Sequence, residues 1–138
     1  MTVYTIGYGG RGKEEVLTLL RSAGIRAVVD VRLRPDRASM GVFAKAKIPG
    51  TGIEAWLREA GFQYFSFVEL GNVFVDRDDW EERYRRLLGL AGSLLTERLG
   101  QVPKPFCLLC AEKNPEQCHR RLIAEYLGER GCHVVHIQ

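Results

Sequence analysis

The sequence has no apolar run that approaches the roughly 20 residues needed to cross a membrane, and its first residues lack the layout of a secretion signal. We therefore expect a cytoplasmic protein with no membrane partner. Cysteine is scarce, with 4 among 138 residues, which is too few for a disulfide scaffold and predicts free thiols. The formal net charge is only +3, which does not by itself indicate nucleic acid as a partner.

The composition that remains is that of a globular domain, with 46% hydrophobic and 27% charged residues. We expect one α/β domain spanning residues 1–138. Apolar patterns predict strands and helices in alternation, with strands at residues 3–6, 27–32, 62–68, 106–110 and 132–137 and helices at residues 13–23, 52–60, 79–99 and 115–130. This alternation predicts a single three-layer domain with a mostly parallel five-stranded sheet and helices on both faces.

The residues with reactive side chains crowd the turn between the fourth strand and the last helix. Asn114 is a good helix cap, and Pro115 suits the first helical position. Ligands of open α/β sheets bind beyond the carboxyl ends of the strands, where this turn lies. The turn therefore predicts a site that contains two thiols, a carboxylate, an imidazole and a guanidinium, from Cys110, Glu112, Cys118, His119 and Arg120.

The predicted last helix directs His119 toward the sheet, because the apolar residues of that helix centre on the same direction. Such a histidine is either a satisfied core residue or part of a site, and its ionisable neighbours favour a site. Cys107 and Cys110 form a CxxC pair, but residues three apart on a strand point to opposite faces. We therefore expect these two thiols to diverge.

The segment Cys-Ala-Glu-Lys-Asn-Pro-Glu-Gln-Cys-His-Arg at residues 110–120 resembles the C-terminal signature of a bacterial and archaeal family, domain of unknown function 488. Three shorter segments are similar to other marks of that family, at residues 5–8, 30–32 and 69–71. The resemblance covers nearly the whole chain. It implies the fold and the position of a site rather than a reaction, because the family has no established activity.

Two further segments follow strands of the predicted sheet. The glycine-rich turn with Gly7, Tyr8 and Gly9 is either a tight turn that needs positive φ or a cradle for phosphate or ribose. Its spacing matches neither the dinucleotide fingerprint nor the Walker A loop, and we expect no cofactor. Asp30 and Arg32 share one side of the second strand, as a structural ion pair or as an acid/base group beside an anion clamp.

These features predict an enzyme, a hydrolase or group transferase, that binds a small anionic, nucleotide-like molecule at the carboxyl edge of the sheet. Proton transfer is assigned to Asp30, Glu112 or His119, and the thiols are candidate nucleophiles. The predicted ligand-binding residues are Gly7, Tyr8, Gly9, Arg32 and Arg120, and the predicted catalytic residues are Asp30, Cys110, Glu112, Cys118 and His119.

Two alternatives belong to other classes of protein. The first is a nucleic-acid-binding module that uses the basic 32–47 loop, with Arg34, Arg37, Lys45 and Lys47. That loop is also interpreted as a lid over the pocket or as a solvated segment, with its central Phe43 favouring docking. The second alternative is a metal-binding domain through Cys110, Cys118 and His119. The sequence does not predict the oligomeric state.

Overall fold

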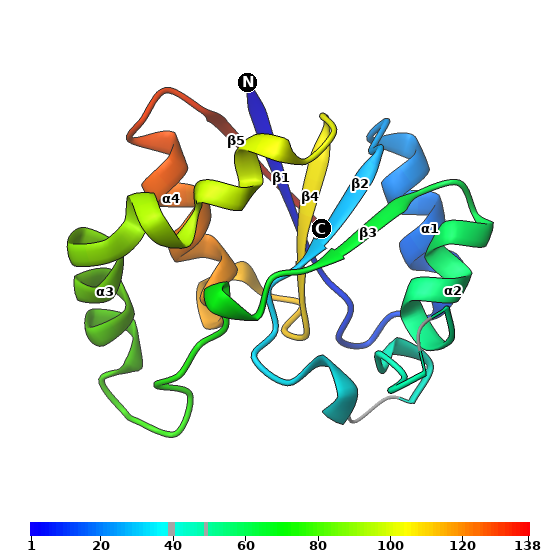
Figure 1. The fold of residues 1–138 in the computed structure, drawn as a ribbon, viewed down its shortest axis with the longest axis horizontal. Coiled ribbons are helices and arrows are strands. Elements are labelled where there is room, and N and C mark those ends of the chain that lie inside the picture. Colours follow the sequence, from blue (N-terminus) through cyan, green and yellow to red (C-terminus); the bar gives the residue numbers. More distant parts are fainter. Residues whose placement is uncertain (39–40, 49) are drawn as a thin grey trace.

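The computed structural model describes residues 1–38, 41–48 and 50–138, which form a five-stranded sheet in the order β3-β2-β4-β1-β5 (Figure 1). The strands are β1 (Thr2–Gly7), β2 (Ala27–Asp30), β3 (Gln63–Ser66), β4 (Phe106–Cys110) and β5 (His133–Ile137). Every neighbouring pair is parallel. The predicted α/β fold is therefore confirmed, with a sheet that is parallel throughout rather than mostly parallel.

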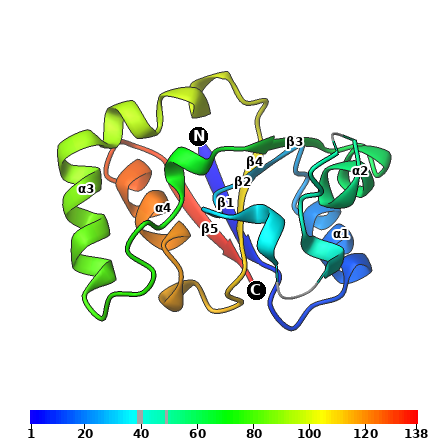
Figure 2. The ribbon, with the colours of Figure 1, turned by 60° about the horizontal axis from the view of Figure 1, so that its bottom comes forward.

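Helices cover both faces of the sheet, so the predicted three layers are confirmed (Figures 1 and 2). Helices α1 (Lys13–Ser22) and α2 (Gly52–Glu59) pack on one face, and α3 (Trp80–Leu95) and α4 (Arg120–Gly128) pack on the other. Among the described residues, no helix combines the length and the apolar character needed to cross a membrane.

Strand β4 is buried on both faces, which explains its continuous apolar sequence. Phe106, Leu108 and Cys110 belong to the core under α3 and α4. Cys107 and Leu109 belong to the core under α1 and α2. The two thiols of the CxxC pair therefore diverge, as the alternation of side chains along a strand predicts.

The predicted start of the last helix is wrong. Asn114 accepts a hydrogen bond from the backbone N–H of Glu116 at 3.0 Å, but it caps only a short 3-10 helix, Pro115–Gln117. Cys118 is then extended, with φ −129° and ψ 140°, and α4 begins at Arg120. A single turn satisfies the capping signal, so Cys118 and His119 lie in the connection before the helix rather than within it.

The middle of the β2–α2 connection, which contains the basic 32–47 loop, is anchored on the α2 side of the sheet. Phe43 is fully buried, and its ring stacks on Tyr8 with 4.3 Å between centroids. The indole N–H of Trp56 donates to the carbonyl of Val42 at 2.8 Å. The predicted docking of Phe43 is therefore confirmed, although residues 39, 40 and 49 of the loop lie outside the described residues.

The topology brings the carboxyl ends of β1, β2 and β4 together, because β4 lies between the other two strands. The connections that leave these strands lie at the lower edge of the sheet in Figure 1. Helices α1 and α2, which follow β1 and β2, cover one face, whereas α4, which follows β4, covers the other. At the carboxyl end of β4, the connections from neighbouring strands therefore leave toward opposite faces of the sheet. Open α/β sheets bind ligands at such a position.

A substitution at Gly92 on α3 would test how closely α3 packs against α4. A Cβ at Gly92 would lie 2.4 Å from ring atoms of Tyr126 on α4. We expect Gly92→Ala to destabilise the protein by ~1–3 kcal/mol in urea unfolding, because the two helices would have to separate or the ring would have to move.

The matched control is Gly89→Ala on the same helix, where a Cβ would meet nothing within 4 Å. Alanine favours helix, so this variant should be more stable than the wild type by up to about 1 kcal/mol. Equal unfolding free energies for the two variants would contradict the packing.

Candidate functional site

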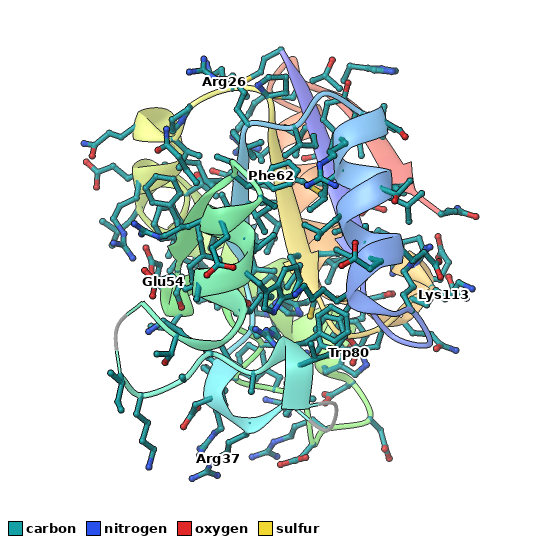
Figure 3. All side chains as sticks on the ribbon, turned by 90° about the vertical axis from the view of Figure 1, so that its right-hand side faces the viewer. Arg26, Arg37, Glu54, Phe62, Trp80 and Lys113 are labelled. Atoms are coloured by element: carbon teal, nitrogen blue, oxygen red, sulfur yellow. The ribbon has the colours of Figure 1, made fainter. Side chains whose placement is uncertain are left out.

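A cavity of about 360 Å³ opens beyond the carboxyl ends of β2 and β4. This volume lies in the range of small-molecule sites. Its polar lining comes from three segments that are distant in sequence. These are Arg32 and Arg34 after β2, Asn72 after β3, and a segment that begins with the last residue of β4, with Cys110, Glu112, Gln117, Cys118 and His119. Figure 3 shows Trp80, which also lines the cavity, toward the lower end of the molecule, opposite Arg26 at the amino end of β2.

Two thiols and one imidazole form the deepest part of this lining. The Sγ atoms of Cys110 and Cys118 lie 3.9 Å and 3.8 Å from Nδ1 of His119. The other ring nitrogen, Nε2, lies 2.8 Å from the carbonyl oxygen of Val31. Because a carbonyl only accepts, Nε2 carries a proton, and Nδ1 faces the two thiols, to which it presents its lone pair whenever the ring is neutral.

Burial controls the protonation of this cluster. It raises the pKa of the Cys118 thiol well above its ordinary value, so the thiol is protonated at neutral pH unless a cation stabilises the thiolate. Burial also opposes a charge on His119, but contacts with Cys118 and the Val31 carbonyl raise the pKa of that imidazole on balance. The three donor atoms of Cys110, Cys118 and His119 lie within 4.8 Å of one another, so these residues could hold a metal ion.

Arg32 joins the cavity to a buried polar cluster behind it. Its Nε and Nη2 donate to the Asp30 carboxylate at 2.8 Å and 2.6 Å, and its Nη1 donates to the Tyr8 hydroxyl at 3.1 Å. Tyr64 donates a further hydrogen bond to Asp30 at 2.7 Å. Burial opposes the charge of Arg32, but Asp30 raises the pKa of the guanidinium above its ordinary value.

Asp30 and Tyr8 do not line the cavity themselves. Asp30 is fully buried, and Tyr8 belongs to the core under α1 and α2. The predicted site residues that line the cavity are therefore Arg32, Cys110, Glu112, Cys118 and His119. Asp30 and Tyr8 contact Arg32 from behind the cavity instead.

Arg120 is also absent from the cavity lining, and its side chain is fully buried. Its Nη1 and Nη2 donate to the carbonyls of Glu112 at 2.6 Å and Lys113 at 3.2 Å. Its Nε donates to the Thr5 hydroxyl at 3.3 Å. The guanidinium thus fixes the backbone that carries Glu112, instead of facing a ligand as the sequence predicts.

Gly7, the last residue of β1, and Gly9 allow the backbone of residues 110–113 to approach closely. The N–H groups of Tyr8 and Gly9 donate to the carbonyls of Cys110 at 3.1 Å and Ala111 at 2.7 Å, so they are not free to cradle a phosphate. A Cβ at Gly7 would lie only 1.7 Å from the Glu112 carbonyl oxygen. The positive φ expected in this turn occurs at Gly10, at 71°, and not at Gly7 or Gly9.

Several lining residues are not predicted from the sequence as part of this site. Trp80 is half-buried at the start of α3 and lines the cavity. Arg34 lies in the loop assigned to nucleic acid, and Asn72 belongs to no motif. Two signals were available in the sequence: Arg34 closely follows the end of β2, and Gln117 lies within the 110–120 segment. Glu69 lies elsewhere, in an ion pair with Arg98 at 2.7 Å.

The role of Arg120 in the fold can be measured directly. Arg120→Ala would leave buried backbone carbonyls without donors and create a void, so we expect unfolding free energy to fall by at least ~3 kcal/mol. Arg86→Ala is the control, because the Arg86 side chain is 70% exposed and forms an ion pair with exposed Glu82. Its effect should stay within about 0.5 kcal/mol. If the unfolding free energy of Arg120→Ala in urea equalled that of the wild type, this role would be refuted.

Comparison with known protein families matches residues 13–127 to the model described as Domain of unknown function DUF488. No curated protein and no solved structure matches the chain. The matched span covers most of the chain and includes every residue named above as lining the cavity. It also includes residues 110–120, which carry the predicted resemblance. The chain therefore belongs to the DUF488 family.

Proposed function

We propose that the protein is a small enzyme, a hydrolase or group transferase, that acts on a phosphorylated small molecule bound in the cavity. One observation carries the proposal. Two arginines from the end of β2 line the same cavity as a carboxylate, an imidazole and two thiols from the β4–α4 segment. Anion-binding groups and groups able to transfer protons thus converge from remote parts of the chain, as in enzyme sites.

The arginines supply the anion-binding end of the proposed site. Arg32 is held in one orientation by Asp30 and Tyr8, and the exposed Arg34 lies two residues further along. Guanidinium groups bind phosphate through paired charge-assisted hydrogen bonds. Trp80 and Val75 add apolar surface to the same cavity, which suits the ring of a nucleotide-like substrate.

Glu112 is the proposed general base. Its side chain is exposed to the cavity, and one carboxylate oxygen lies 3.6 Å from the Cys110 thiol. In the proposed reaction, Glu112 accepts a proton from water or an acceptor hydroxyl, whose oxygen attacks the substrate phosphorus. The bond to the leaving oxygen breaks, and that oxygen takes the proton back from Glu112. The Val31 carbonyl holds His119 in place beside the thiols of Cys110 and Cys118.

Exposed basic side chains favour a second candidate function, a nucleic-acid-binding module. Arg34, Arg37 and Lys47 are exposed, whereas Lys45 is half-buried. Such a module would bind through phosphate contacts made by several of these side chains, and its affinity would fall steeply as salt rises. The two functions differ in which arginine matters, because Arg34 lines the cavity and Arg37 does not.

The first test measures the thermal stability of the protein with nucleoside monophosphates, sugar phosphates and inorganic phosphate. A ligand at 100 times its Kd should stabilise the folded protein by ~2.7 kcal/mol. Arg34→Ala should weaken the binding of that ligand by at least about tenfold, because a charge-assisted hydrogen bond is lost.

Arg37→Ala is the control and should bind the same ligand as the wild type does. Equal losses in both variants, together with a steep salt dependence for a single-stranded oligonucleotide, would favour the nucleic-acid module instead. Absence of stabilisation by every phosphorylated compound would refute the proposed substrate class.

The second test measures turnover of p-nitrophenyl phosphate and bis(p-nitrophenyl) phosphate. Glu112→Gln should lower kcat by ~10²–10⁴-fold, the usual contribution of a general base, while KM changes little. Glu116→Gln is the matched control in the same connection, since the Glu116 side chain is 72% exposed and absent from the cavity lining. Undiminished kcat in Glu112→Gln would remove Glu112 from the mechanism.

A further inference from the structure

We infer that the Sγ atoms of Cys110 and Cys118 and Nδ1 of His119 bind a Zn²⁺ ion in the wall of the cavity. These three residues alone would bind the ion. Its catalytic use rests on the proposed function, which it deepens by naming the group that activates the attacking water.

The spacing of the donor atoms fits a tetrahedral zinc site. With Zn–S bonds of about 2.3 Å and a Zn–N bond of about 2.0 Å, tetrahedral ligands lie roughly 3.5–3.8 Å apart. Nδ1 of His119 lies 3.9 Å and 3.8 Å from the two sulfur atoms. All three atoms lie within 4.8 Å of one another. Small side-chain movements would complete the coordination.

The imidazole is already held in the orientation that a metal ligand needs. Its Nε2–H donates to the Val31 carbonyl at 2.8 Å, which leaves the Nδ1 lone pair directed at the sulfur atoms. Histidines that bind metals usually donate their second ring N–H to a carbonyl or carboxylate in this way. The ring of Tyr84 packs edge-on against the imidazole, with 5.4 Å between centroids. His119 therefore needs no reorientation to bind zinc.

Charge balance also favours zinc. Cys110, Cys118 and His119 are only 5%, 1% and 5% exposed, and an uncompensated charge at this depth would be costly. Two thiolates and one neutral imidazole carry a charge of −2, which Zn²⁺ neutralises. Thiolate ligands also favour zinc over hard cations such as magnesium or calcium. The cluster is thus matched to this ion in both charge and chemistry.

Three protein ligands leave a fourth position, and all three ligands line the cavity. An open fourth position is typical of catalytic zinc, whereas structural zinc is usually bound by four protein ligands. Glu112 contacts Cys110 from outside the three-ligand group, and its exposed carboxylate can turn toward a water in the fourth position. Zinc would lower the pKa of that water, and Glu112 would accept its proton before the hydroxide attacks phosphorus.

The other two cysteines provide internal controls. Cys107 is fully buried three residues before Cys110, but it belongs to the core on the opposite face of the sheet. Cys132 is half-buried before β5 and is not part of the three-residue group. Neither thiol should contribute to metal binding.

The experiment is a titration of the chelator-treated 138-residue chain with Co²⁺, followed by Zn²⁺, under reducing conditions. We expect one Co²⁺ per chain, with thiolate-to-cobalt charge-transfer and tetrahedral d–d absorption that Zn²⁺ abolishes. Cys118→Ala should weaken binding more than about 100-fold, beyond the loss usual for groups outside the coordination sphere. Cys107→Ala should bind as the wild type does.

The wild-type titration decides the assignment even if a variant fails to fold. Absence of the cobalt spectrum from the wild type would overturn the zinc site, as would unchanged binding in a folded Cys118→Ala variant. Phosphate-ester binding that depends on Arg34 without any zinc binding would reject the zinc site and leave the proposed function. Zinc binding without affinity for any phosphate ester would support the zinc site and reject the proposed function.

Discussion

The candidate site depends on how closely the backbone after β4 approaches the glycines that end β1. Tyr8 and Gly9 donate to carbonyls of this segment, and Gly7 leaves no room for a Cβ beside the Glu112 carbonyl. Arg120 holds the same segment by donating to the carbonyls of Glu112 and Lys113. Because every one of these contacts is to backbone, they fix where Cys110 and Glu112 point without occupying their side chains.

The second wall of the cavity is built at the end of β2 and is joined to the first by one imidazole. Asp30 and Tyr8 hold the guanidinium of Arg32 at the edge of the cavity, and Tyr64 in turn donates to Asp30. A buried ion pair of this kind adds little net stability, so orientation is its clearest effect. His119 belongs to the β4–α4 segment yet donates to Val31 after β2, which fixes the two walls relative to each other.

The sequence predicts those parts of the molecule that follow from local patterns. Alternation along a strand separates Cys107 from Cys110, and the alternation of strands with helices places Arg32, Cys110 and His119 at one edge. Roles that depend on pairing between distant segments are not predicted. Spacing predicts a ligand role for Arg120 and Gly7, because it cannot identify their partners, the carbonyls of residues 112 and 113. The sequence also predicts too early a start for α4, because one 3-10 turn satisfies the Asn114 capping signal.

The end of β2 and the β4–α4 segment should act as one ligand site. Backbone amide NMR shifts, recorded during titration with the phosphorylated compound that stabilises the protein most, measure this directly. If the two segments bind the ligand together, the largest shifts will occur together at Arg32, Arg34, Glu112 and Cys118, whose side chains line one cavity. Large shifts confined to Arg37 and Lys47, with the amides of Glu112 and Cys118 unchanged, would contradict it.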